Sequence, residues 1–100
     1  IKYDQVSADK FLKKEILSPL KDVVDALKRS EWNQESISEA LKSVCEKHEI
    51  GFGKIGQPIR IAVTGGTQSP SIDQTLILLD QSIVVDRIEA AIEYIVENSN

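Results

Sequence analysis

The sequence predicts an all-helical domain, a compact bundle of five to six short helices around one core. Apolar residues recur at spacings of three and four through most of the chain, which is the pattern of amphipathic helices. Residues that favour helix starts precede several of these segments. The 5 glycines and 3 prolines are too few for a disordered or fibrous chain. A chain of 100 residues therefore forms about one domain with a single modest core.

Helical periodicity dominates residues 1–50. Ser7 is expected to cap a first short helix, Ser18 followed by Pro19 to begin a second, and Asn33 to begin a third. The positions expected to face the core are Ala8, Phe11 and Leu12, then Leu20, Val23, Val24 and Leu27, then Ile37, Ala40, Leu41, Val44, Cys45 and His48.

The middle of the chain breaks this pattern. The stretch IGFGKIGQP, residues 50–58, contains three glycines and a proline and is typical of a connector. The next residues, Ile59–Thr64, are β-branched and alternating, so propensity alone favours a strand there.

Two further helices are expected after this strand-like segment. Ser69 or Ser71 is expected to cap the first of them, with Pro70 in its first turn, and Ser82 to cap the last. The polar residues 97–100 should end the last helix. The expected core positions are Ile72, Leu76 and Leu79, then Val84, Ile88, Ala91, Ile92 and Ile95.

Composition limits the classes of partner and compartment. The net charge of −4 argues against broad adhesion to nucleic acid or to an anionic membrane, since those partners favour a basic surface. No apolar run approaches the roughly 20 residues of a membrane span. The single cysteine, Cys45, excludes an internal disulfide and fits a reducing cytosol. Because the sequence begins at Ile1 without an initiator methionine, we expect a fragment of a longer protein.

Catalytic and metal sites are not favoured. Cys45 and His48 stand three residues apart, close enough to act as nucleophile and base or to share a metal. A zinc site needs about four ligands, and the chain has no second cysteine or histidine. Gly65–Gly66 matches neither a P-loop nor a dinucleotide fingerprint. We therefore expect core packing for this pair, and no catalytic residue, metal or cofactor in the chain.

The most informative stretch is GQPIRIAVTGGTQSPSIDQTLILL, residues 56–79. Arg60 lies in an apolar context upstream of the polar loop TGGTQSPS, residues 64–71. Such a loop offers backbone groups, hydroxyls and a helix start that could grip phosphates and read unstacked bases. The residues alone favour a simpler alternative, in which Arg60 is tied to a carbonyl or to Asp73 within a turn between two helices.

This stretch resembles the end of the anticodon-binding domain of bacterial glutamyl-tRNA synthetases, which are class I aminoacyl-tRNA synthetases. The family pattern Q-P-[LI]-R-x-A-[LV]-T-G is followed by S-P, and residues 57–60, 62–65 and 69–70 fill it. The closing VDRIEAAIEYI is similar to the last helix of the family, with Arg87 and Ile88 at the matching positions. The resemblance covers most of the chain.

The resemblance implies a helical cage, so Ile59–Thr64 should be helical after all. It implies one domain, residues 1–100, that is the C-terminal part of a larger ligase, with a helical half at 1–50 and an anticodon-facing half at 51–100. The implied function is recognition of the tRNA anticodon by a glutamate–tRNA ligase. A catalytic domain outside this chain would use ATP with magnesium, so the chain itself should be non-catalytic. The implied partners are the anticodon loop of tRNA(Glu) and that catalytic domain, in a cytoplasmic monomer that binds neither membrane nor DNA.

The resemblance also implies roles for six residues. Arg60, Ser69, Pro70 and Ile72 would contact the anticodon bases, while Thr64 and Gly65 would shape the loop; no catalytic or metal-binding residue is implied.

Two residues depart from the family pattern. Asp80 stands where the family has Gly, which should alter the end of the preceding helix, and Gly66 stands where a basic or larger residue is common. Both departures make the surface less positive and weaken the binding expected of this chain.

One alternative function is a small helical protein-interaction module. Its apolar groove would lie between the last two helices, with Ile83 as an exposed apolar position.

Overall fold

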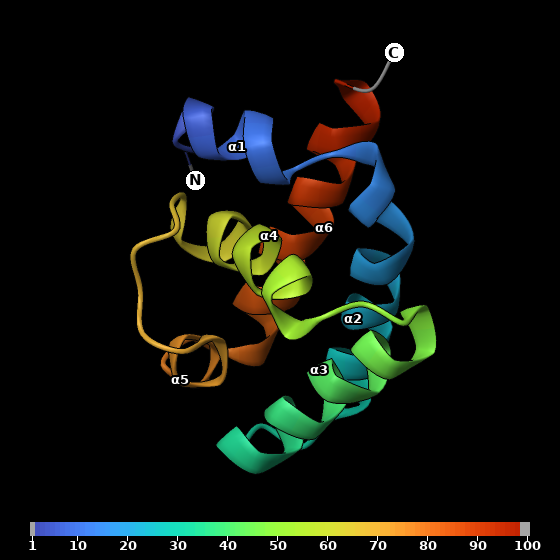
Figure 1. The fold of residues 1–100 in the computed structure, drawn as a ribbon. Coiled ribbons are helices and arrows are strands. Elements are labelled where there is room, and N and C mark those ends of the chain that lie inside the picture. Colours follow the sequence, from blue (N-terminus) through green and yellow to red (C-terminus); the bar gives the residue numbers. More distant parts are fainter. Residues whose placement is uncertain (1, 99–100) are drawn as a thin grey trace.

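The structure, a computed structural model, describes residues 2–98. In that range, all of its regular secondary structure is helical. The predicted all-helical class is confirmed. The molecule measures 35 × 26 × 20 Å (Figure 1). The elements are α1 (Gln5–Phe11), the one-turn 3₁₀ helix η1 (Lys14–Ile16), α2 (Leu17–Arg29), α3 (Gln34–His48), α4 (Phe52–Thr64), α5 (Ile72–Ile77) and α6 (Gln81–Glu97).

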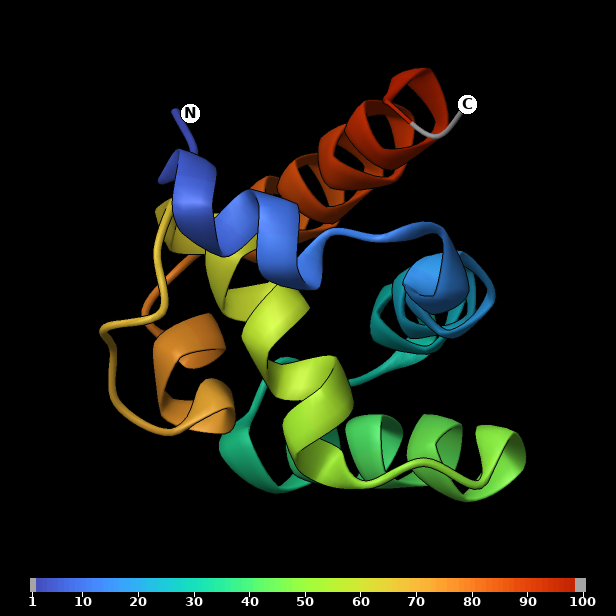
Figure 2. The same cartoon turned by 45° about the horizontal axis from the view of Figure 1, so that its top comes forward.

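Helix α4 lies at the centre of the arrangement, and the other helices enclose it (Figures 1 and 2). It contacts α1, α2, α3, α5 and α6, while α2 also packs against both α3 and α6. One face of α4 remains uncovered, toward the viewer in Figure 1. This arrangement is the helical cage that the resemblance implied.

The start of α1 differs from the prediction, whereas the start of α3 confirms it. Asp4, not Ser7, caps α1, because its Oδ2 accepts the Ser7 N–H at 3.1 Å and the Ser7 hydroxyl at 2.6 Å. An aspartate three residues upstream therefore outcompetes the serine as a cap. Asn33 caps α3 as predicted, since its Oδ1 accepts the Ser36 N–H at 2.8 Å.

The start of α2 is also earlier than predicted. The helix begins at Leu17, directly after η1, so Ser18 lies inside the first turn instead of capping it. Pro19 is tolerated there because the first N–H groups of a helix have no intrahelical acceptor.

Helix α4 overturns two predictions made from local sequence. Residues 52–58 are helical and do not form a connector, and Ile59–Thr64 is not the strand that propensity favoured. The helix implied by the resemblance is confirmed. Propensity differences between residues amount to about 1 kcal/mol, whereas full burial of an aliphatic side chain contributes roughly 1.5–3 kcal/mol. The buried side of α4 carries Ile55, Pro58, Ile59, Ile61, Ala62 and Val63.

Helix α5 begins at one of its two predicted caps, whereas α6 begins at another residue than predicted. Ser71 occupies the N-cap position of α5, so Pro70 precedes the helix and does not lie in its first turn. Asp80, not Ser82, occupies the N-cap position of α6. This helix ends at Glu97, and Asn98 follows as its C-cap. Residues 99–100 of the polar tail lie outside the described part of the chain.

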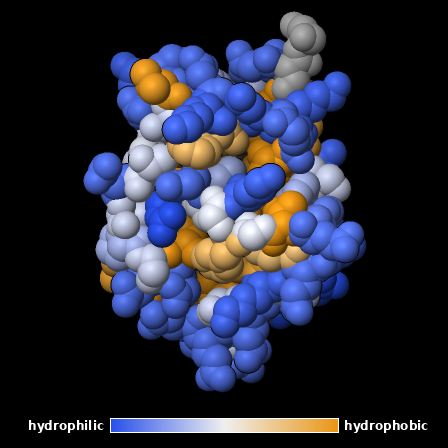
Figure 3. Space-filling model, viewed as in Figure 1, coloured by the Kyte–Doolittle hydropathy of each residue, from blue (hydrophilic) through white to orange (hydrophobic). Residues whose placement is uncertain are grey.

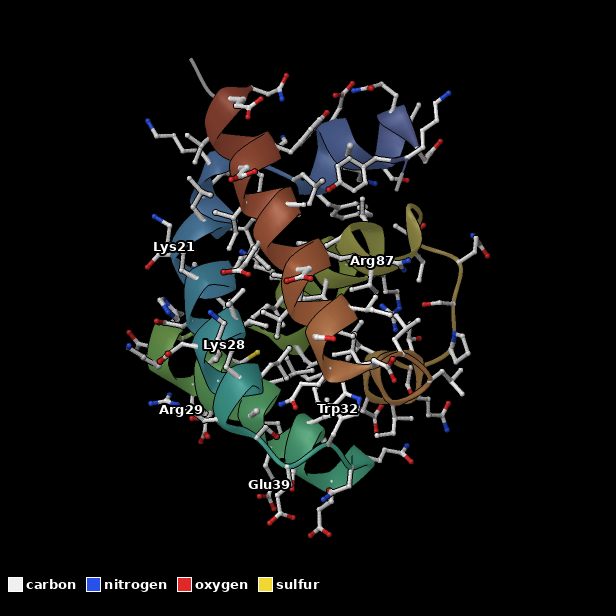
Figure 4. All side chains as sticks on the ribbon, turned by 180° about the vertical axis from the view of Figure 1, so that it is seen from behind. Lys21, Lys28, Arg29, Trp32, Glu39 and Arg87 are labelled. Atoms are coloured by element: carbon white, nitrogen blue, oxygen red, sulfur yellow. The ribbon has the colours of Figure 1, made fainter. Side chains whose placement is uncertain are left out.

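Most of the predicted core positions are buried or half-buried. Two side chains then join the α2–α3 turn to the α5–α6 turn. The indole N–H of Trp32 donates to the Leu79 carbonyl at 2.8 Å. The amide of Gln81 donates to the carbonyls of Leu27 at 2.7 Å and Ser30 at 3.1 Å. Figure 4 shows Trp32 at this junction, seen from behind.

Within residues 2–98, every helix is too short or too polar to cross a lipid bilayer.

Candidate nucleic-acid interface

Arg60 lies in the second half of α4 and is half-buried. Its Nε donates to the Ser69 hydroxyl at 3.1 Å and to the Pro70 carbonyl at 3.4 Å. Its Nη2 donates to the same carbonyl at 3.4 Å, and its Nη1 donates to Gln57 Oε1 at 3.4 Å. The guanidinium therefore ties the loop at residues 65–71 to α4.

These contacts answer part of the question that the sequence left open. Arg60 is tied to a carbonyl, as the simpler alternative expected, and its partner is Pro70. Asp73 is engaged elsewhere, since its Oδ2 accepts from Gln34 Nε2 at 3.0 Å. Hydrogen bonds from Ser71 first, then from Gln34, hold the pKa of Asp73 below its usual value.

The hydrogen bonds to Ser69, Pro70 and Gln57 leave part of the Arg60 guanidinium free to donate to a ligand. A guanidinium carries five N–H groups in a planar fork. The bonds above use the Nε–H and one N–H on each terminal nitrogen. Within residues 2–98, the remaining N–H of Nη1 and that of Nη2 have no protein acceptor. Arg60 is thus able to hold the loop and donate to a base edge or a phosphate at the same time.

Gly65 and Thr64 set the path of the loop. Gly65 ends α4 with a φ of 90°, in the left-handed region that favours glycine. Its carbonyl accepts the Asp4 N–H at 2.6 Å, which joins the loop to the start of α1. The Thr64 hydroxyl donates to the Arg60 carbonyl at 2.7 Å and accepts the Gly66 N–H at 3.4 Å.

Among the remaining predicted site residues, only Ser69 and Pro70 lie at the surface with Arg60. Pro70 is exposed and Ser69 is half-buried. Ile72 is 1% exposed and lies in the core below the loop, so the structure does not bring its side chain to the surface with the others. The Thr75 hydroxyl donates to the Pro70 carbonyl at 3.1 Å and fixes the loop to α5.

Sequence reasoning did not assign a site role to Arg87 or to Gln57. Arg87 is half-buried on α6, and its Nη1 donates to the Val63 carbonyl at 2.7 Å (Figure 4). It lines a hollow of about 400 Å³ beside the loop. Gln57 precedes Arg60 by three residues, a spacing that predicts contact once the segment is taken as helical. The lining residues of the hollow are Val63, Thr64, Gln68, Ser69, Pro70, Thr75, Leu78, Leu79 and Arg87.

The two departures from the family pattern lie on either side of α5. Gly66 is half-buried and follows the left-handed turn directly. Asp80 is not part of the end of α5, which finishes at Ile77 with Leu78 as its C-cap. It stands instead at the start of α6, where the helix dipole favours a negative charge.

Cys45 and His48 do not form a nucleophile and base pair. Cys45 is 7% exposed, and burial raises the pKa of its thiol, whereas a nucleophilic cysteine needs a lowered pKa. His48 Nε2 instead contacts Asp22 Oδ2 at 2.5 Å, across from α3 to α2. Among residues 2–98, no group of three or more His, Cys, Asp or Glu side chains could hold a metal ion.

The Asp22 contact gives a prediction for stability. Hydrogen bonds with His48 first, then with Lys47, lower the pKa of Asp22 in the folded state. A carboxyl group with a lowered pKa stabilises the fold above its unfolded pKa and loses that contribution as pH falls through the folded value. Asp22→Asn should therefore reduce the free energy of unfolding by up to about 1 kcal/mol at neutral pH. The difference should begin to shrink as pH falls below the ordinary Asp pKa of about 3.9, and it should vanish below the lowered pKa of the folded state.

Urea unfolding of both proteins across this pH range tests the prediction. Asp25→Asn is the matched control, because Asp25 pairs with the exposed Arg29 at 3.1 Å and should matter less. A pH-independent loss in Asp22→Asn would contradict the assignment to the carboxylate charge.

The fold and the site together define a small helical module that presents an arginine and a polar loop on one face, which is an arrangement suited to RNA recognition. The family model described as an anticodon binding domain matches residues 1–92, and the chain belongs to this family. The predicted resemblance to anticodon-binding domains is thereby confirmed.

A solved structure shows the same fold. It is a crystal structure of a glutamate tRNA ligase from Elizabethkingia meningosepticum in complex with its amino acid. The TM-score is 0.88 at 21% sequence identity, and the match covers 94% of this chain. It covers 19% of that chain, so the present chain spans about one fifth of the ligase.

Proposed function

We propose that this chain is the anticodon-recognition module of a glutamate–tRNA ligase, and that it positions tRNA(Glu) for glutamylation by a catalytic domain outside the chain. Membership of the anticodon-binding family and the fold shared with a glutamate tRNA ligase support this proposal. The main structural support is the hydrogen bonding of Arg60. This side chain holds the loop at 65–71 and keeps two N–H groups for a further acceptor.

In this proposal, the anticodon bases splay beside α4 and Arg60 donates to the edge of one of them. Ser69 and Pro70 form the adjoining edge of the site, while Thr64 and Gly65 hold the loop in shape. Ile72 contributes by supporting the loop from the core. The half of the chain from residue 51 to 100 thus faces the anticodon loop, and residues 1–50 complete the cage.

The proposal places the chemistry elsewhere. ATP and magnesium belong to the catalytic domain of the parent ligase, and the chain acts as a cytoplasmic monomer within that parent. Since the net charge is −4, few phosphates should be contacted, and binding should depend only weakly on salt.

The test is a titration of a labelled anticodon stem-loop of a glutamate tRNA at low salt. Arg60→Ala should weaken binding by about tenfold or more, which corresponds to roughly 1.4 kcal/mol of the 1–3 kcal/mol typical of a good bidentate base contact. Arg60→Lys should recover little, because lysine keeps the charge but not the planar fork.

Arg29→Ala serves as the matched control, because Arg29 is an exposed arginine of α2 on the opposite side of the molecule (Figure 4). An unrelated stem-loop controls for specificity, and circular dichroism shows that each variant is folded. Equal binding of both stem-loops, or no binding at all by the folded chain, would contradict the proposal that this chain reads the anticodon.

A protein-interaction module remains the second candidate, and exposed apolar side chains favour it. Leu78, at the end of α5, is 79% exposed, and Ile83, in the first turn of α6, is 38% exposed. Under that alternative, Ile83→Asp would abolish binding of the partner and Arg60→Ala would have no effect. Under the anticodon proposal, Arg60→Ala would weaken RNA binding and Ile83→Asp would leave it unchanged.

A further inference from the structure

Phe52 is an aromatic side chain that the core does not use. The chain has five aromatic residues, and the other four are half-buried against the core. Phe52 is the first residue of α4 and is 39% exposed. Phe52 therefore presents part of an apolar aromatic ring at the surface.

Phe52 lies on the same face of α4 as Arg60. Phe52, Gly56, Arg60 and Thr64 follow one another at four-residue spacing, which aligns them along one side of a helix. A Cβ at Gly56 would lie 3.5 Å from Arg60 Nη1 and 3.9 Å from Phe52 Cδ1. The phenyl ring and the guanidinium therefore both lie beside Gly56, which has no side chain to separate them.

Phe52 is exposed and Arg60 is half-buried on this side of α4. Figure 3 shows apolar surface in the middle of this face, over α4, surrounded by hydrophilic side chains. A flat apolar ring beside a planar cation is a surface on which bases stack, because every base has a π-face whatever its hydrogen-bonding edge.

A group of lysines lies near the start of α4, on a different side of the helix from Phe52, although the chain is acidic. A hollow of about 350 Å³ there is lined by Lys10, Lys13 and Lys54, with Glu15 as its one acidic side chain, and Phe52 is not among its lining residues. Three cations against one anion favour a polyanion over a neutral or basic protein surface.

We propose that Phe52 is a stacking platform for an anticodon-loop base adjacent to the one that Arg60 contacts. This inference rests on the proposed function and extends it from one contact to a stretch of RNA along the whole of α4. Because a phenyl ring cannot distinguish base edges, Phe52 contributes affinity, whereas Arg60 contributes base identity.

The test uses the same chain and the labelled stem-loop. Phe52→Ala should weaken binding by about five- to tenfold, and Phe52→Trp should bind at least as tightly as the native chain. Phe52→Leu should lose about as much as Phe52→Ala, because leucine is apolar but has no π-face. The ratio of affinities for the cognate and an altered anticodon should be unchanged in Phe52→Ala and should fall in Arg60→Ala.

Stem-loops with single abasic nucleotides then locate the contact. One loop position should weaken binding to the native chain when its base is removed, and should have no further effect on Phe52→Ala. Val96→Ala is the matched control, since Val96 is 54% exposed near the end of α6.

The possible failures are distinct. If Phe52→Ala binds like the native chain while Arg60→Ala does not, the stacking platform is wrong and the proposed function stands. If Phe52→Leu binds like the native chain, the surface needs only apolar area, as in docking of a protein segment, and stacking is wrong. If the native chain binds no stem-loop, the proposed function and this inference both fail.

Discussion

Replacing Ile59 with alanine should lower the free energy of unfolding by about 2–5 kcal/mol, the largest loss we expect from a single substitution. Ile59 is fully buried on the core side of α4, next to Arg60 in sequence but facing the interior. The substitution removes apolar contacts and leaves a cavity, because the enclosing helices relax only in part. Since a small domain has about 5–15 kcal/mol of total stability, this variant should be close to unfolding at ordinary temperature.

Urea unfolding followed by circular dichroism measures this effect. Ile83→Ala provides the matched control, because Ile83 is 38% exposed and the same atoms are removed at the surface. A loss below about 1 kcal/mol in Ile59→Ala would mean that this side of α4 is not packed as the structure describes.

Replacing Gly65 with alanine should cost about 1–3 kcal/mol, because an L-residue with a side chain rarely adopts a φ of 90°. If the backbone rotates to relieve this strain, the carbonyl that accepts the Asp4 N–H at 2.6 Å must move as well. The loop at 65–71 should then shift relative to Arg60. We therefore expect weaker binding of the anticodon stem-loop in addition to the lower stability.

Gly66→Ala is the control for this second prediction. A Cβ at Gly66 would have no heavy atom within 4 Å, and the residue has no positive φ. Its substitution should change stability by no more than about 0.5 kcal/mol. Equal effects at the two glycines would contradict the left-handed turn at Gly65.

The helices with a clear amphipathic stripe were predictable from sequence. Asn33 and the stripe from Ile37 to Cys45 placed α3 correctly, because the cap and the apolar spacing agree. Helix α4 was predictable only through the family resemblance. Its glycines, its proline and its β-branched residues all argue locally against a helix, and only burial between five other helices reverses that preference.

The candidate site was predictable in composition but not in geometry. The sequence pointed to Arg60, Ser69 and Pro70, yet their contact depends on the left-handed turn at Gly65, which brings residues nine and ten positions downstream back onto α4. Arg87 was missed because its partner, the Val63 carbonyl, belongs to a different helix. Backbone acceptors across a helix interface leave no pattern in the sequence.

The Trp32 contact provides an optical probe of this region. Trp32 is the one tryptophan of the chain, and its indole N–H is bonded to the carbonyl of Leu79, a residue that lines the hollow beside the loop. Indole emission depends on hydrogen bonding and solvent exposure, so loosening of the α5–α6 corner should shift the emission to longer wavelength. The native chain therefore carries an internal fluorophore that reports on the α5–α6 corner without an added label.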